Sequence, residues 1–256
     1  MRARATSSCA WPTRSTVTEV RGLDGVTALV TGASRGIGLA TARRLAADGA
    51  QVALLARSRA TLAAGVAACG PTARAIACDL TREDEVAHAL TELRAIFGVP
   101  HLLVNNAGHF ALGAVGVMPP AEVERMLTLN VLAPYRLLHA LVPEMRARGS
   151  GHLITIGSVA DRAVFPENAG YAAGKYGARA MHEVLRQELR GTGVRASLVS
   201  PGPVDTALWD PIDPDSRPGF TPRAQMLSAD AVADAVHWVA TRPSSVNIDE
   251  LRLGRA

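Results

Sequence analysis

Short apolar runs alternate with longer segments of helical periodicity along most of the chain. Apolar residues recur with helical spacing over five segments, namely 36–48, 61–68, 83–97, about 121–148 and 169–191. Seven short apolar runs of strand length alternate with them, at 26–30, 51–56, 73–78, 101–105, 152–157, 195–200 and 247–253. Most of these runs are continuous, which is typical of parallel strands covered on both faces. The pattern therefore predicts an α/β fold with a doubly wound parallel sheet and right-handed crossovers.

The beginning of the chain differs from the rest. Residues 1–22 are polar and rich in Ser, Thr and Arg, and we expect them to form a flexible N-terminal extension without the apolar core of a secretory signal. Residues 23–256 show no linker and are expected to form a single domain. Within it, the Pro- and Asp-rich segment 201–222 cannot be a regular helix or strand. Because long loops in compact domains are usually functional, we expect a substrate loop at about 203–227.

Composition argues against several classes of protein. The 256 residues carry 27 Lys and Arg against 23 Asp and Glu, a net charge of +4 without basic runs, which is not typical of nucleic-acid binding. No apolar run is long enough to predict a membrane span. Cys9, Cys69 and Cys78 are too few and too scattered for a disulfide framework or a zinc site. We therefore expect no metal and a cytoplasmic protein with reduced thiols.

A glycine-rich turn, TGASRGIG (31–38), follows the first strand and opens the first helix. Small residues there let the backbone approach a pyrophosphate, and the helix N-terminus supplies N–H groups, although a tight turn without a ligand is the alternative. NAD sites usually carry an acid after the second strand, but here Arg57 and Ser58 follow it. Together with Arg35 in the glycine turn, Arg57 fits a 2′-phosphate, which favours NADP over NAD unless both arginines are simply surface charge.

Further polar residues stand at strand ends and inside one helix. Asp79 follows the third strand and could accept a hydrogen bond from an adenine amino group or cap a helix. NNAG (105–108) closes the fourth strand with small residues that again allow a close approach of a ligand. Asn130 lies inside a predicted helix, where Asn is unfavourable, so it needs a local reason, of which a solvent-facing position is the simplest.

A serine, a tyrosine and a lysine form a third constellation. Ser158 ends the fifth strand, and Tyr171 and Lys175 follow in YAAGK, four residues apart on one helix face. A tyrosine ordinarily has a pKa of about 10, and a neighbouring ammonium favours its phenolate form, as proton exchange at neutral pH requires. Lys175 is the only lysine, and a random placement four residues after one of three tyrosines has a chance of roughly 1%.

Taken together, TGASRGIG, NNAG, Asn130, Ser158, YAAGK and the Pro201-Gly202 turn resemble the short-chain dehydrogenase/reductase family of the single-domain type, over about 25–254. The resemblance implies a Rossmann-like seven-stranded parallel sheet with helices on both faces, and nicotinamide-dependent carbonyl or alcohol chemistry. By resemblance, Tyr171 is the proton donor or acceptor. Lys175 tunes the acidity of Tyr171 and holds the nicotinamide ribose. Ser158 polarises the substrate carbonyl, and Asn130 helps to order a proton-relay water.

The resemblance also implies a cofactor site, with Thr206 near the nicotinamide carboxamide and pyrophosphate, and Arg35 and Arg57 where NADP-preferring members carry basic residues. The residues expected to bind NADP(H) are Gly32, Ser34, Arg35, Gly36, Ile37, Gly38, Arg57, Ser58, Asp79, Leu80, Asn106, Ala107, Gly108, Tyr171, Lys175, Pro201, Gly202, Val204 and Thr206. The C-terminal VNIDELRLGRA departs from the Gly-Gly-x-x-x-Asp-Gly-type ending of many members. It resembles the ending of a subgroup that contains 3-hydroxy-acid and serine dehydrogenase-like enzymes and some aldehyde reductases of antibiotic pathways, which is a weak pointer to substrate.

The sequence therefore indicates an NADPH-dependent oxidoreductase. A non-catalytic NADP-binding sensor or scaffold and an NAD-dependent alcohol dehydrogenase are the alternatives. The residues expected at the rim of the site are mostly apolar and favour a medium-sized hydrophobic ketone or aldehyde: His109, Phe110, Val159, Val164, Phe165 and Trp209. Phe165 and Trp209 could equally be packing residues, and Arg162 could meet a substrate carboxylate or face solvent. The resemblance implies a homodimer or homotetramer through the helices that carry Asn130 and Tyr171.

Overall fold

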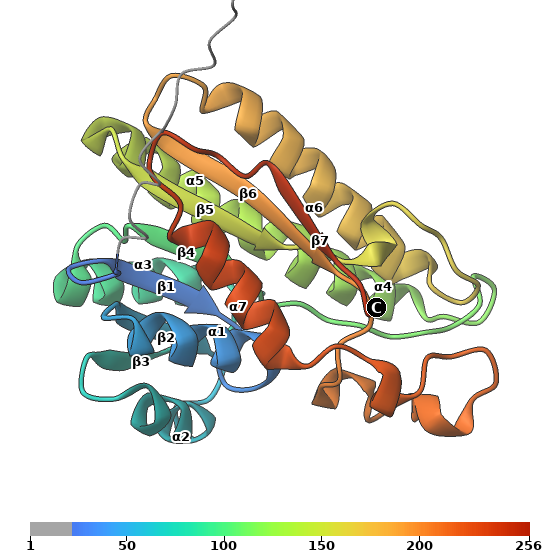
Figure 1. The fold of residues 1–256 in the computed structure, drawn as a ribbon. Coiled ribbons are helices and arrows are strands. Elements are labelled where there is room, and N and C mark those ends of the chain that lie inside the picture. Colours follow the sequence, from blue (N-terminus) through green and yellow to red (C-terminus); the bar gives the residue numbers. More distant parts are fainter. Residues whose placement is uncertain (1–21) are drawn as a thin grey trace, which may run out of the picture.

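A single parallel sheet forms the centre of the molecule. The computed structural model describes residues 22–256, so the expected N-terminal extension lies outside the described residues except for Gly22. The seven strands follow the spatial order β3-β2-β1-β4-β5-β6-β7, and every neighbouring pair is parallel (Figure 1). Their bounds are β1 Thr27–Thr31, β2 Gln51–Ala56, β3 Ala73–Ala77, β4 Leu102–Asn105, β5 Gly151–Ile156, β6 Val194–Pro201 and β7 Glu250–Leu253.

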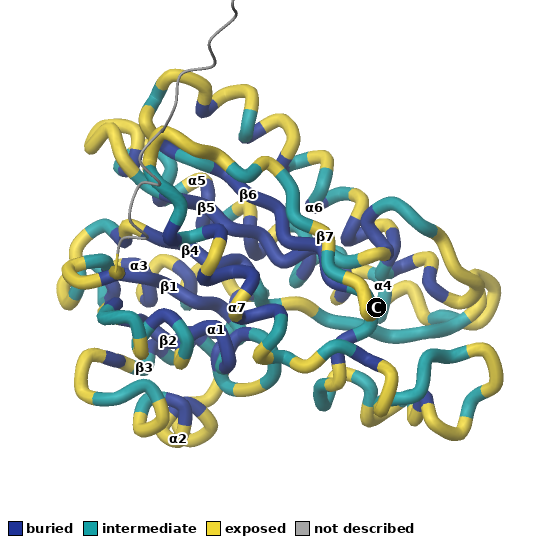
Figure 2. Tube along the Cα trace, in the orientation of Figure 1, coloured by how far each residue is buried: buried dark blue, intermediate teal, exposed yellow. Residues whose placement is uncertain are grey.

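Helices cover both faces of this sheet, and each face has its own apolar core. One core joins the sheet to α1 (Gly36–Ala47), α2 (Arg59–Cys69) and α7 (Ala229–Ala240). The other joins it to α3 (Glu83–Phe97), α5 (Ala133–Arg148) and α6 (Ala169–Glu188). The central strands are buried along nearly their whole length, as the dark segments of Figure 2 show. This burial on both faces explains their continuous apolar sequences and confirms the predicted fold class.

The strand order reverses at β1, because β1 is flanked by β2 on one side and β4 on the other. The connections from these strands leave in opposite directions and open a crevice beyond their carboxyl ends, where ligands of such folds usually bind. The glycine turn after β1 and the NNAG segment after β4 both end at this crevice. The fold therefore brings the predicted motifs of the first half of the chain to one edge of the sheet.

The segment predicted as one helix over about 121–148 is interrupted. It consists of α4 (Pro120–Leu127), a π-helical turn over Thr128–Leu132 and α5. The turn contains Asn130, which is buried, so the alternative of a solvent-facing position is wrong. A π-helical turn is rare and is frequently found at functional sites.

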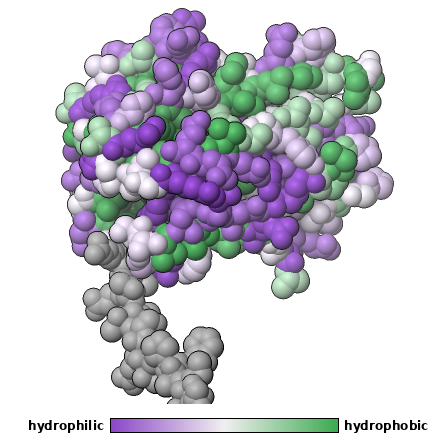
Figure 3. All heavy atoms as spheres, turned by 90° about the horizontal axis from the view of Figure 1, so that it is seen from above, coloured by the Kyte–Doolittle hydropathy of each residue, from purple (hydrophilic) through white to green (hydrophobic). Residues whose placement is uncertain are grey.

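The segment after β6 is irregular, as its prolines predict. It contains only three single 3₁₀ turns, at Ala207–Trp209, Pro214–Ser216 and Arg223–Gln225, and Val204 pairs with Leu227 in an isolated bridge. In the surface view of Figure 3, hydrophilic side chains predominate and hydrophobic ones gather in smaller areas. Among the described helices, none combines the length and apolar character that crossing a membrane would need.

Candidate active site

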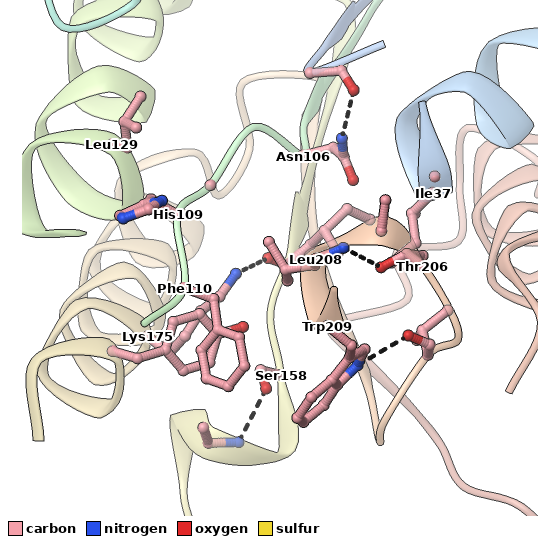
Figure 4. A pocket seen from close by; sticks show the side chains of 18 of the residues that line it. Ile37, Asn106, His109, Phe110, Leu129, Ser158, Lys175, Thr206, Leu208 and Trp209 are labelled. Atoms are coloured by element: carbon pink, nitrogen blue, oxygen red, sulfur yellow. Dashed lines mark hydrogen bonds between the residues drawn. The ribbon is translucent and has the colours of Figure 1, made fainter. Parts of the chain in front are cut away.

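One cleft of about 970 Å³ lies beyond the carboxyl ends of the strands. Every residue predicted to bind cofactor lines it except Gly38, and every residue predicted to be catalytic lines it except Asn130. Both exceptions are buried directly behind the lining. Sequence reasoning missed other lining residues, among them Arg125, Leu129, Gly157, Glu167, Leu208 and Phe220. Figure 4 shows Ser158, Lys175, Phe110 and Trp209 around one hollow, with Ile37, Asn106 and Thr206 farther along it.

The glycine turn needs its glycines for backbone conformation and for space. Gly32 and Gly36 have φ values of +64° and +56°, in the left-handed region that favours glycine. A Cβ on Gly32 would lie 2.9 Å from the Cα of Ala107, so the β1 and β4 loops touch backbone to backbone. The Asn106 side chain joins them further, since its Nδ2 donates to the Thr31 carbonyl oxygen over 2.8 Å. The turn therefore forms a closely packed backbone surface at the base of the cleft, which a ligand can approach.

The N-terminus of α1 follows this turn, and no acidic side chain of its first turn occupies its free N–H groups. Its N-cap residue, Arg35, makes no capping hydrogen bond through its side chain, and the first turn of the helix contains no acidic residue. The first N–H groups of a helix have no partner within the helix and favour an anion. An uncapped helix end above a glycine cradle fits the pyrophosphate of a dinucleotide.

Two arginines stand at the end of the cleft formed by β2. Arg35 and Arg57 are exposed, and neither pairs with a carboxylate within the described part of the chain. Ser58 caps α2 by accepting a 3.4 Å hydrogen bond from the Thr61 N–H. Arg125 also lines the cleft there. The arrangement offers guanidinium groups to an anionic ligand and contains no carboxylate at the tip of β2.

Asp79 lies at the same end and shapes its own turn. Its Oδ1 accepts from the N–H and the hydroxyl of Thr81, at 2.9 and 2.7 Å. Partial burial tends to raise the pKa of this carboxyl, but the Thr81 hydrogen bonds and the nearby charges of Arg57 and Arg82 outweigh it and lower the pKa. Asp79 is therefore an anion whose other oxygen remains available to a ligand. The N-cap of α3 is Arg82, so the alternative role of Asp79 as a helix cap is wrong.

Cys78, beside Asp79, also lines the cleft. Burial and the charges of Glu85 and Asp79 raise its pKa to about 12, so it stays a neutral thiol. Over residues 22–256, no group of three or more His, Cys, Asp or Glu side chains is arranged to hold a metal ion.

The tyrosine and lysine of YAAGK lie on the first turns of α6 and face the cleft. The Lys175 Nζ is 5.6 Å from the centre of the Tyr171 ring and donates to the Ile156 carbonyl oxygen over 2.9 Å. Lys175 is 8% exposed, so its ammonium is held in one place. The Ser158 Oγ accepts the Ala160 N–H at 3.1 Å, which leaves the hydroxyl hydrogen free to donate into the cleft.

Asn130 supports this cluster from behind. Its Oδ1 accepts the His109 N–H and its Nδ2 donates to the His109 carbonyl oxygen, both over 2.9 Å. On its other side it packs against Gly174 of α6, where a Cβ would come within 3.0 Å of the Asn130 Cβ. Gly174 directly precedes Lys175. The buried amide thus holds the 109–110 segment beside the helix that carries Tyr171 and Lys175.

Aromatic side chains form the wall beyond Tyr171. The Phe110 ring meets the Tyr171 ring edge to face at 4.7 Å and the Trp209 ring at 5.1 Å, and Phe220 continues the row 6.4 Å from Trp209. The Trp209 Nε1 donates to the Val204 carbonyl oxygen over 3.1 Å, so its polar atom is satisfied. The wall is apolar because the polar atom of Trp209, its Nε1, is bonded to the backbone of the protein.

One predicted rim residue, Val164, and the nearby Arg162 do not lie as expected. Val164 is 76% exposed and does not line the cleft, so its place in the predicted rim is wrong. The Arg162 guanidinium pairs with Asp161, over 2.8 Å, and with Glu250. It therefore neither reaches out to a substrate carboxylate nor faces solvent freely. The remaining rim residues all line the cleft: His109, Phe110, Val159, Phe165 and Trp209.

Comparison with known proteins agrees with this geometry. A model of the family described as short chain dehydrogenase matches residues 26–217. An uncharacterized oxidoreductase of Staphylococcus epidermidis is 31% identical over 226 residues, which cover 88% of this chain and 95% of that protein. The ketoacyl reductase HetN of a Nostoc species is 38% identical over 183 residues, covering 70% of this chain and 64% of that protein.

Solved structures show the same fold. A metagenomic short-chain oxidoreductase in complex with NADP is 36% identical, with a TM-score of 0.78, over 92% of this chain and 99% of that one. An alcohol dehydrogenase from the archaeon Thermococcus sibiricus, complexed with 5-hydroxy-NADP, is 30% identical, with a TM-score of 0.80, over 89% and 95%. The chain belongs to the short-chain dehydrogenase family and is an oxidoreductase of that type, a family that uses a nicotinamide cofactor.

Proposed function

We propose that this protein is an NADPH-dependent reductase that interconverts a ketone or aldehyde and the corresponding alcohol. The observation that carries the proposal is the convergence of Ser158, Tyr171 and Lys175 in one cleft with the glycine turn and its uncapped helix. Each of these groups has a chemical use at a carbonyl carbon, and together they suffice for the reaction. A sensor or scaffold without turnover would not need a buried lysine beside a tyrosine at this place.

The roles follow from the chemistry of the side chains. The Ser158 hydroxyl donates a hydrogen bond to the substrate oxygen and holds it beside Tyr171. Tyr171 gives its phenolic proton to that oxygen in reduction and takes it back in oxidation. The fixed Lys175 ammonium stabilises the negative charge that then develops on the phenol oxygen. Bound cofactor supplies or accepts the hydride. Asn130 acts from outside the cleft, by holding the segment that begins at His109.

The preference for NADPH rests on charge at the end of the cleft formed by β2. Arg35 and Arg57 are unpaired within residues 22–256, and no acid stands after β2 to accept the two ribose hydroxyls of NAD. Paired N–H groups of guanidinium match phosphate oxygens, and the pairing is charge-assisted. Two solved relatives bound to NADP-type cofactors support the same preference.

We further propose an uncharged, largely apolar substrate. The wall next to Tyr171 consists of Phe110, Trp209 and Phe220. The ionisable side chains near it are already engaged, since His109 bonds Glu122 and Glu167 pairs with Arg217 over 2.8 Å. A substrate carboxylate would have to be desolvated there without a free cation, which is costly. A medium-sized hydrophobic ketone or aldehyde suits this wall.

We also expect a homodimer or homotetramer. Leu132 and Tyr135 around the start of α5, and Tyr176 and Val184 on α6, are large apolar side chains that are 41% to 58% exposed. Apolar groups gathered on neighbouring helices favour association. Light scattering of the purified protein tests this expectation, and a strictly monomeric protein contradicts it.

The test of the proposed reaction compares the wild type with Tyr171→Phe. We expect the wild type to oxidise NADPH in the presence of neutral apolar ketones or aldehydes, and the variant to lose nearly all turnover while binding NADPH normally. Tyr176→Phe, on the same helix but outside the cleft lining, is the matched control and should stay active. An active Tyr171→Phe enzyme would refute the mechanism, and tight NADPH binding without turnover on any carbonyl would favour a sensor.

A further inference from the structure

A fully buried carboxylate lies directly beneath Ser158. Asp161 ends the short 3₁₀ turn that follows Ser158, and its side chain is 0% exposed. Its Oδ2 accepts the Ser158 N–H over 3.2 Å, and its own N–H donates to the Ser158 carbonyl oxygen over 2.9 Å. The backbone of Ser158 is therefore held from both sides by one residue.

The same carboxylate oxygen also binds the next strand. The Ser200 hydroxyl on β6 donates to Asp161 Oδ2 over 2.5 Å, and Ser200 directly precedes the Pro201-Gly202 turn of the cleft. Gly157 makes room for this contact, since a Cβ there would lie 2.5 Å from Asp161 Oδ2 and would also meet the Ser200 hydroxyl. Asp161 thus joins the end of β5, which carries Ser158, to the end of β6, which leads into the cofactor loop.

Two arginines balance the buried charge and tie it to the C-terminal strand. The Arg162 Nε contacts Asp161 Oδ1 over 2.8 Å, and Arg179 of α6 lies 3.7 Å from the same oxygen. Both arginines also pair with Glu250 on β7, Arg179 over 3.2 Å. A buried carboxylate without such partners would strongly destabilise the fold. With these partners, Asp161 is held in place by contacts that reach α6, β6 and β7.

We propose that Asp161 is a positioning residue for catalysis, acting through Ser158; the inference rests on the proposed function of Ser158. The turn held by Asp161 lets the Ser158 Oγ accept the Ala160 N–H, so that its hydrogen points to the substrate oxygen. An asparagine at 161 has one acceptor oxygen instead of two and would place N–H groups against at least one existing donor. The Ser158 hydroxyl would then still be present, but it would no longer be held in one orientation.

A double-mutant cycle tests this inference. Asp161→Asn, Ser158→Ala and the double variant are compared in single turnover, with enzyme in excess over NADPH, so that slow rates remain measurable. We expect Asp161→Asn to lower the rate of reduction about 10- to 100-fold with the NADPH dissociation constant unchanged, and to add less than about 3-fold in the Ser158→Ala background. A merely structural role predicts the same loss in both backgrounds.

Asp234→Asn is the matched control, because it removes a carboxylate from the exposed ion pair with Arg44 on the far side of the sheet. It should keep the wild-type rate. If Asp161→Asn does not fold, Ser200→Ala replaces it in the cycle, since it removes one donor to the carboxylate and leaves the charges in place; we expect a smaller loss, again absent without Ser158. Additive losses would overturn this inference alone, whereas a wild-type rate in Ser158→Ala would overturn the proposed role of Ser158 and this inference with it.

Discussion

Gly38 is the position at which the close packing between α1 and the glycine turn can be tested most sharply. It is the third residue of α1 and is buried against the glycine turn. A Cβ there would lie 2.5 Å from the Asn106 Nδ2 and 2.8 Å from the Gly32 carbonyl carbon, and it would meet the Gly32 oxygen as well. Ordinary contact needs about 3.4 Å or more, so Gly38→Ala must push the start of α1 outward by about 1 Å.

Three terms set the size of the effect. Overpacking of this kind costs about 1–3 kcal/mol. Disturbing the Asn106 hydrogen bond adds about 1 kcal/mol, and the better helix propensity of Ala returns about the same amount. The net loss of about 1–3 kcal/mol should lower Tm by about 2–12 °C in a chain of this size. Because the helix N–H groups move with the helix, NADPH affinity should fall about 10- to 100-fold.

Thermal melting and NADPH titration by intrinsic fluorescence measure both quantities. Gly116→Ala is the matched control: the same atoms are added, but nothing lies within 4 Å of the new Cβ and no positive φ is involved. It should keep the wild-type Tm and NADPH affinity. If Gly38→Ala melts within a degree of the wild type and binds NADPH equally well, the close approach of α1 to the glycine turn is not what shapes the cofactor site.

The remaining predictions concern charge, pH and the aromatic wall. Arg57→Ala should weaken NADPH binding about 10-fold and leave NADH binding unchanged, by calorimetry, with the exposed Arg43→Ala as control; equal effects on both cofactors would contradict a phosphate contact. Burial, with a smaller effect of the Arg195 charge, holds the pKa of His152 well below its usual range. The unfolded chain therefore takes up this proton first, and the free energy of unfolding should fall as pH drops below about 6.5, by up to about 1.4 kcal/mol per pH unit. Urea unfolding should show a shallower slope for His152→Gln, and identical slopes would count against the assignment. Trp209→Ala should raise KM for an apolar aromatic ketone about 10-fold without changing KM for NADPH, and an unchanged ketone KM would remove Trp209 from the substrate wall.

The residues that line the cleft could be predicted where the prediction depends on local residue types. Each of these motifs lies within one short stretch of the chain: the glycines between a strand and a helix, and the tyrosine four residues before the only lysine. The backbone of a parallel sheet then places such segments at one edge. For this reason, the cleft contains nearly all the residues expected from the sequence, Gly32, Ser158 and Tyr171 among them.

Other features depend on contacts between distant segments or on small shifts of the backbone. The π-helical turn at Asn130 gives no periodic signal, and only the unfavourable Asn inside a helix hinted at it. Asp161 is bonded by Ser200, and Arg162 is paired with Glu250, both far along the chain, so no local pattern could reveal why Arg162 is engaged. Val164 lies in an irregular segment, where the direction of a side chain does not follow a period.

A thermal shift with NADPH and with NADH tests the central claim most directly, namely that the cleft holds NADPH against Arg35 and Arg57. A ligand that binds only the folded state raises stability by about 2.7 kcal/mol at a hundredfold excess over Kd. We predict a clear rise in Tm with NADPH and a much smaller one with NADH. A larger rise with NADH would mean that Arg35 and Arg57 are surface charge, and no rise with either cofactor would contradict the proposed site itself.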